Sequence, residues 1–155
     1  MNKKQSRRTT EPFHPPRRRP WQTSPDPRKP LLWLAKGRED DGERYLVNAT
    51  GETLDQVIAD VGGCITVDDD ALPVTSESPY TYRNVANGEA VKVEHFDGYY
   101  DLDYLLQIVL EIQSPTLGRV IILTPPEKGG VGELVLLWED GAAGRHVSIK
   151  EIASD

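Results

Sequence analysis

Apolar residues alternate through the ten residues 104–113, the longest strongly apolar stretch of the chain. Read with a period of two, one face is apolar throughout: Tyr104, Leu106, Ile108, Leu110 and Ile112. The opposite face is mixed: Leu105, Gln107, Val109, Glu111 and Gln113. A helical period fits less well, and the β-branched residues favour a strand. The stretch is therefore predicted to be a central antiparallel strand, with one face covered and the other left to water, another element or another protein.

Shorter apolar or alternating runs recur along the chain, separated by turn residues. They lie at residues 31–36, 44–48, 64–67, 80–85, 90–96, 119–124, 133–139 and 145–152. The first two runs are expected to pair as a hairpin, and Asn87-Gly88 is typical of a tight hairpin turn. Roughly 7–9 short strands separated in this way predict a mainly β protein, a single antiparallel β-sandwich with an immunoglobulin-like arrangement.

Residues 53–61 fit two secondary structures. Thr53 and Gln56 are spaced as a capping box, and glycines follow at the end, as expected for a short helix. The alternation of Val57, Ala59 and Val61 fits a strand equally well. The sequence leaves both interpretations open.

The first thirty residues differ sharply from the rest. They contain nine basic and two acidic residues, seven of the twelve prolines, and no Leu, Ile or Val. Such a segment buries too little apolar area to offset the cost of ordering its backbone. Residues 1–30 are therefore expected to form a disordered basic arm. Residues 31–155 are expected to form an acidic β-sandwich domain, with 9 basic and 23 acidic residues and a net charge of −14.

Cysteine and hydropathy limit the class of protein. Cys64 is the single cysteine, so neither an internal disulfide nor a thiolate zinc site is expected. No secretory signal pattern follows the N-terminal lysines, and no apolar run approaches the roughly 18–20 residues that cross a bilayer. A cytoplasmic protein without a membrane segment is expected.

Three aspartates form the most suggestive acidic cluster: Asp97, Asp101 and Asp103. Carboxylates beside a glycine and a strand start could supply oxygen ligands to Ca²⁺. Their spacing does not match an EF-hand loop, and aspartates in turns are also explained by local hydrogen bonding. Apart from this possible Ca²⁺ site, no cofactor is expected.

Enzyme signatures are weak in this chain. The nucleophile pattern Gly-x-Ser-x-Gly does not occur, and the three histidines are isolated in sequence. The loop at residues 127–132 lacks the lysine and hydroxyl spacing of a phosphate-binding loop. A non-catalytic protein is therefore the first hypothesis.

The arm indicates contact with another molecule. Its candidate binding residues are Arg7, Arg8, Arg17, Arg18, Arg19 and Trp21, joined by the aromatic pair Tyr99 and Tyr100. Arginines near an aromatic ring suit nucleic acid, and they equally suit an acidic protein surface, including this protein's own domain or a neighbouring copy. A solubilising tail without a partner is the third interpretation.

The sequence thus predicts a non-catalytic protein-interaction module whose basic arm contacts a partner. The alternatives are a nucleic-acid-associated accessory protein that binds through residues 1–30 and a small metal-dependent hydrolase. The sequence does not indicate an oligomeric state.

Overall fold

The computed structural model of the chain describes residues 7–15, 28–38, 40–63, 80–96 and 105–152. The described residues form eleven β-strands and no α-helix. Nine of these strands have four or more residues, in agreement with the number expected from the sequence. The described residues contain no helix long and apolar enough to cross a membrane. The strand predicted at residues 64–67 lies outside the described residues.

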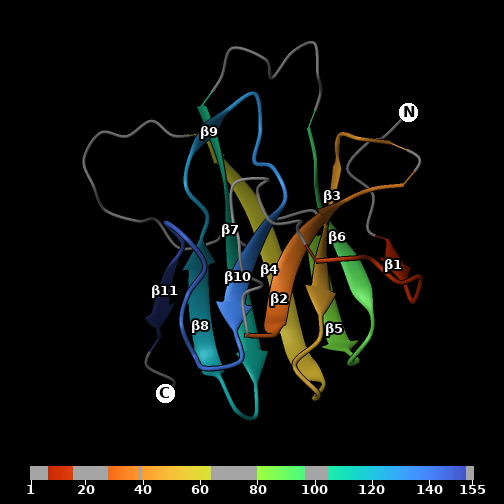
Figure 1. The fold of residues 1–155 in the computed structure, drawn as a ribbon, viewed down its shortest axis with the longest axis vertical. Helices are drawn as coiled ribbons and strands as arrows, with labels where there is room; N and C mark the ends of the chain where they lie inside the picture. The colour runs from red at the N-terminus through yellow and green to blue at the C-terminus, as the bar shows by residue number, and fades with distance from the viewer. Residues whose placement is uncertain (1–6, 16–27, 39, 64–79, 97–104, 153–155) are drawn as a thin grey trace.

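The strands form two antiparallel sheets, which lie one behind the other in Figure 1. Sheet A has the order β1 (Arg8–Thr9), β6 (Ala90–His95), β3 (Glu43–Asn48), β2 (Pro30–Lys36) and β10 (Leu134–Trp138). Sheet B has the order β11 (Ser148–Glu151), β8 (Gly118–Leu123), β7 (Leu105–Ser114), β4 (Leu54–Gly63) and β5 (Tyr80–Val85). The short strand β9 (Glu127–Lys128) pairs with one end of β7.

The main apolar core lies between the two sheets. Ile108, Leu110 and Ile112 of β7 are fully buried there with Leu34 and Leu46 of sheet A. The apolar face predicted for residues 104–113 is therefore confirmed from residue 106 onward, because alternate strand residues point to opposite faces. The described part of the chain is mainly β, and its two open sheets do not close into a barrel.

The helix considered for residues 53–61 does not form. Residues 54–63 are strand β4, which pairs with β5 on one side and with β7 on the other. Val57 and Ala59 are fully buried at alternate positions, as the strand interpretation requires. A ladder on both edges satisfies the backbone of a central strand, and it outweighs a local capping preference of about 1 kcal/mol.

The hairpin predicted for residues 80–96 is wrong. Its turn is present, with Gly88 at φ 92°, but β5 belongs to sheet B and β6 to sheet A. Asn84 adopts φ 52°, and beyond it β5 remains paired with β4 through Val85 and Leu54. Val85 is buried, whereas a simple alternation along β5 would place it with the exposed Thr81 and Arg83. The chain passes from sheet B to sheet A between Val85 and Ala90, through the turn at Asn87-Gly88. The hairpin predicted for residues 31–36 and 44–48 is confirmed as β2 and β3.

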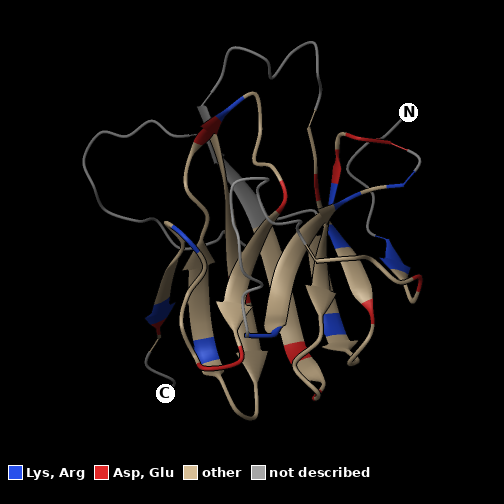
Figure 2. Ribbon diagram, in the orientation of Figure 1, with Lys and Arg blue, Asp and Glu red and all other residues tan. Residues whose placement is uncertain are grey.

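Charged residues lie mostly near strand ends and in connecting loops (Figure 2). Sheet A carries an exception at the end of β3 and β6, where Glu43, Arg44, Lys92 and Glu94 are all buried. Burying charges is costly unless each has a partner, so this corner of sheet A requires a specific explanation.

Candidate interaction site

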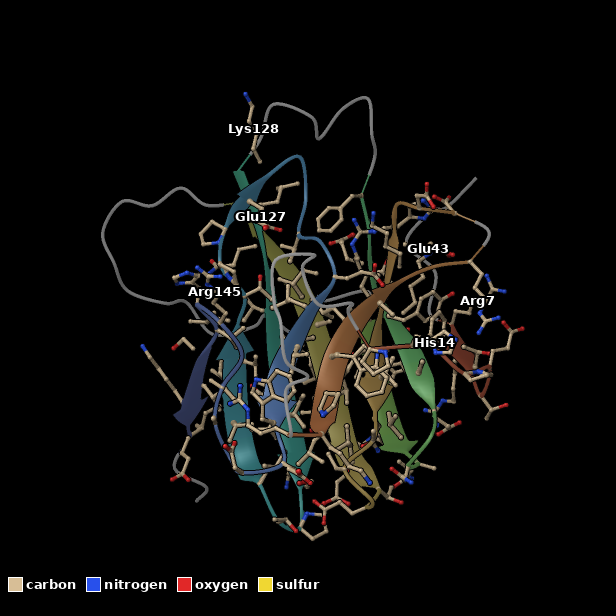
Figure 3. The ribbon with its side chains drawn as sticks, viewed as in Figure 1. Arg7, His14, Glu43, Glu127, Lys128 and Arg145 are labelled. Atoms are coloured by element: carbon tan, nitrogen blue, oxygen red, sulfur yellow. The ribbon has the colours of Figure 1, made fainter. Side chains whose placement is uncertain are left out.

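The N-terminal segment, residues 7–15, lies against sheet A instead of extending into solvent. Arg8 and Thr9 form β1 and pair with Val91 and Ala90 of β6. The amide of Lys92 donates to the carbonyl oxygen of Arg7 at 2.8 Å. From β1 the segment continues across the outer face of sheet A, and His14 lies in front of the sheet (Figures 1 and 3). The composition of residues 1–30 predicted a disordered arm, whereas the structure places residues 7–15 on sheet A.

The composition of a segment does not show which strand edges and carboxylates other parts of the chain supply to it. A segment poor in aliphatic residues cannot build its own core. It can still be ordered by an unpaired strand edge and by carboxylates that another part of the chain supplies. The structure provides both at the edge of β6.

The Arg8 side chain connects the two sheets. Its Nη1 donates to the carbonyl oxygen of Asn84 at 3.0 Å, and its Nη2 donates to that of Arg83 at 2.8 Å. Nη1 also lies 3.3 Å from the Oε1 of Glu89. Asn84 and Arg83 belong to β5 of sheet B, whereas β1 belongs to sheet A. Arg8 therefore closes the corner between β6 and β5, using the carbonyl that the left-handed Asn84 presents.

Arg7 is held by its backbone and, more loosely, by its side chain. Its amide donates to the Tyr82 hydroxyl at 3.0 Å, and that hydroxyl donates to the carbonyl oxygen of Lys92 at 2.5 Å. The guanidinium Nη1 lies 3.9 Å from the Oε2 of Glu43. Tyr82 thus joins β5, β6 and the N-terminal segment through one hydroxyl group.

A chain of polar groups continues from Glu43 beneath Arg7. The Lys92 ammonium lies 3.4 Å from the Oε2 of Glu43 and 3.4 Å from the Nδ1 of His95. The His95 Nε2 lies 2.8 Å from a carboxylate oxygen of Asp40. Because an ammonium group can only donate, Nδ1 accepts from Lys92, and Nε2 carries the proton given to Asp40. The opposite charges of Glu43 and Lys92 compensate for their burial, and the chain reaches solvent at Asp40, whose side chain is 49% exposed.

Phe13 covers part of the outer face of sheet A. Its ring stacks on that of Tyr45, with centroids 5.2 Å apart and an interplanar angle of 24°. The Arg38 guanidinium lies 5.3 Å from the centre of the Phe13 ring and donates to the carbonyl oxygen of Pro12. Burial, followed by the nearby charge of Glu43, raises the pKa of Tyr45. The segment thus adds an aromatic layer to a second, smaller apolar cluster, which contains Trp33, Ala35, Tyr45, Val47 and Ala90.

Two cavities lie beside the segment. The smaller, of about 100 Å³, lies beneath it between Arg7, Phe13 and Glu43. The larger, of about 650 Å³, lies beside its end and is lined by Phe13, His14, Pro15, Ala35, Lys36, Arg38, Gly132 and Glu133. Three of these lining residues are basic or can become so. Phe13 lines both cavities, so open space on the outer face of sheet A extends to either side of its ring.

The structure describes only two of the predicted binding residues. It brings Arg7 and Arg8 together on the β6 edge, where both contact this protein's own carboxylates. The others lie outside the described residues: Arg17, Arg18, Arg19, Trp21, Tyr99, Tyr100, Asp97, Asp101 and Asp103. The described residues contain no group of three or more side chains placed to hold a metal ion. The proposed Ca²⁺ site remains a prediction.

Sequence reasoning missed the residues that receive the segment, chiefly Glu43, Tyr82, Glu89 and Lys92. In residues 90–96, Val91 and Val93 alternate with Lys92 and Glu94, a pattern that ordinarily places the charged residues in solvent. The structure buries Lys92 to 5% exposure and Glu94 to 2%. The two charged residues Lys92 and Glu94 in one strand were the available sign of a covered site. They indicate such a site only when the segment that covers the strand is known.

Comparisons with models of protein families, with curated proteins and with solved structures find no match for this chain. The function is therefore proposed from the site itself.

Proposed function

We propose that this protein is a non-catalytic interaction module that binds an extended segment of a protein along the edge of β6. The observation that supports the proposal is the placement of residues 7–13, which contact the two sheets in the way that a bound peptide would. Strand addition to an exposed edge is a common mode of peptide recognition. In this mode, backbone hydrogen bonds give affinity and alternate side chains give specificity.

Each element of recognition has a counterpart at this edge. The β1–β6 pairing supplies the backbone hydrogen bonds. Glu89 and two carbonyl oxygens of β5 receive one arginine, and Glu43 lies near the other. Tyr45 provides an aromatic surface for the ring of Phe13. The acidic balance of residues 31–155 favours approach of a basic segment at long range.

The test is binding in trans. A chain that lacks residues 1–15 is first shown by circular dichroism and thermal unfolding to remain folded. It is then titrated with a fluorescent peptide of residues 7–15, and saturable binding that weakens with added salt is expected. A peptide with the same residues in scrambled order is the matched control. Equal binding of the two peptides, or binding of neither, contradicts the proposal.

Nucleic-acid binding through the arm is the alternative, and the site reduces its scope. Binding to single strands changes with salt by a slope of about −0.7 per neutralised phosphate. If all nine basic residues of the arm bind phosphates, the salt slope is at most about −6. Arg7 and Arg8 contact protein carboxylates, and without them the largest slope is about −5. The immunoglobulin-like arrangement and the cytoplasmic location are likewise retained as predictions.

A further inference from the structure

The N-terminal segment occupies the proposed binding edge through contacts that do not require it to belong to the same chain. The hydrogen bonds of Arg7 and Arg8 to residues of β5 and to Glu89 join positions 75 to 81 residues apart in sequence. Phe13 likewise stacks on a ring from β3. A segment of another protein that places the same groups in the same order would find the same partners.

The segment is also held weakly enough to be displaced. The Arg7 side chain is 53% exposed and lies 3.9 Å from its carboxylate, and the Arg8 side chain is 36% exposed. Exposed ion pairs of this kind each contribute little to stability. Strand β1 has only two residues. The larger cavity beyond Phe13 offers a competing segment contact area beside that used by residues 13–15.

We infer that residues 7–13 are a built-in competitor for the edge of β6. The partner is a protein segment that carries two adjacent basic residues and, five positions after the second, an aromatic residue. This inference rests on the proposed function and adds two statements to it, the chemistry of the partner and the state of the site before the partner arrives. The partner must displace the protein's own segment to bind.

The cost of that competition follows from the tether. Residues 16–27 join the segment to the rest of the chain, and a ligand tethered by about a dozen residues has an effective concentration of the order of 1 mM. If the protein's own segment binds the open site with a dissociation constant near 100 µM, a partner segment would bind the intact chain roughly tenfold more weakly than a chain with an open site.

A reversible lock tests this inference on the full-length chain. Thr9 and Ala90 are paired neighbours, and paired antiparallel residues have Cα atoms about 4.5–5.5 Å apart, within the range for a disulfide. Thr9→Cys and Ala90→Cys are combined with Cys64→Ser, which removes the native thiol. The fluorescent peptide of residues 7–15 is expected to bind the reduced protein at least about tenfold more tightly than the oxidised protein. Equal affinity in the two states overturns the inference.

A second variant gives the answer even if the lock disturbs folding. Arg8→Ala weakens the tethered segment but leaves the edge of β6 intact. Affinity for a peptide that retains its arginine is therefore expected to rise several-fold. Arg119→Ala on sheet B is the control and is expected to leave affinity unchanged. An unchanged or lower affinity for Arg8→Ala overturns the inference, because a merely structural role of Arg8 predicts that direction.

Two further experiments distinguish a segment supplied by a second copy from an intramolecular one, and failure of this inference from failure of the proposed function. Disulfide-linked dimers formed by mixing two chains that both carry Cys64→Ser, one with Thr9→Cys and the other with Ala90→Cys, would show that a second copy supplies the segment, and would overturn an intramolecular competitor. If the chain lacking residues 1–15 binds the peptide and the intact chain binds it equally well, the inference fails while the proposed function stands. If the shortened chain does not bind the peptide, the proposed function fails.

Discussion

The outer faces of the two sheets both carry apolar residues, but in different surroundings. On sheet A, Trp33 and Tyr45 are only 6% and 3% exposed, and Phe13 stacks on Tyr45. On sheet B, the outward residues Ile58, Val109 and Ile121 remain partly exposed. The clusters of buried apolar residues in the described part of the chain lie between the sheets and on the outer face of sheet A. The outer face of sheet A differs because residues 7–13 bring it the ring of Phe13 and the charges of Arg7 and Arg8.

The charged pairs on the two faces offer the largest expected difference. Glu43 lies 3.4 Å from Lys92 on sheet A, and both side chains are nearly inaccessible. Glu43→Ala is expected to lower the free energy of unfolding by about 3–5 kcal/mol, because it leaves the Lys92 charge buried without its carboxylate. Urea denaturation measures the change.

The matched control is Glu111→Ala on sheet B. Glu111 lies 3.3 Å from Arg119, whose side chain is 39% exposed. Solvent screens this pair, so a loss of only about 0.2–1 kcal/mol is expected. Similar losses for the two variants would show that the corner of sheet A does not hold its charges in the buried arrangement described.

Buried tyrosines predict how stability changes at alkaline pH. Burial, followed by the charge of Glu94, raises the pKa of Tyr80 well above its usual value. The unfolded chain then loses its phenolic proton first, so stability is fully present below about pH 10 and falls as the pH rises above it. Tyr80→Phe is expected to flatten this decline. Denaturation curves between pH 9 and 12 that retain the original slope in Tyr80→Phe would argue against the buried position.

The ring stack on sheet A gives a smaller effect than the loss of Glu43, and it tests whether Phe13 stabilises the face that it covers. A double-mutant cycle of Phe13→Ala and Tyr45→Ala is expected to show a coupling of about 0.5–1.5 kcal/mol, as for other aromatic pairs. Additive effects of the two substitutions would show that the segment does not rest on Tyr45. Thr81→Ala, an exposed change on β5, serves as the control paired with Phe13→Ala.

The sequence predicted what repeats locally. The period of two in residues 104–113 identified the buried side of β7, because one face of a central strand must enter the core. The hairpin of β2 and β3 followed from two apolar runs separated by a polar turn. These features depend on neighbours in sequence, and a single chain displays them directly.

Long-range choices were not accessible in the same way. Residues 53–61 carried a helix signal and a strand signal, and pairing with β5 and β7 decided between them. The Asn87-Gly88 turn was correct, but β5 and β6 belong to different sheets. The role of Arg8 depends on Glu89 and on two carbonyl oxygens of β5, which no local pattern connects to the N-terminus.

Residues 7–13 occupy the edge of β6, and the hydrogen bond donated by the amide of Lys92 offers a direct test of this placement. That amide donates to Arg7 at 2.8 Å, whereas the neighbouring amide of Val91 points toward β3. Residue-resolved hydrogen exchange by NMR should show both amides protected in the intact chain. In the chain lacking residues 1–15, Lys92 alone should lose its protection. Equal exchange of Lys92 in the two chains would contradict the account.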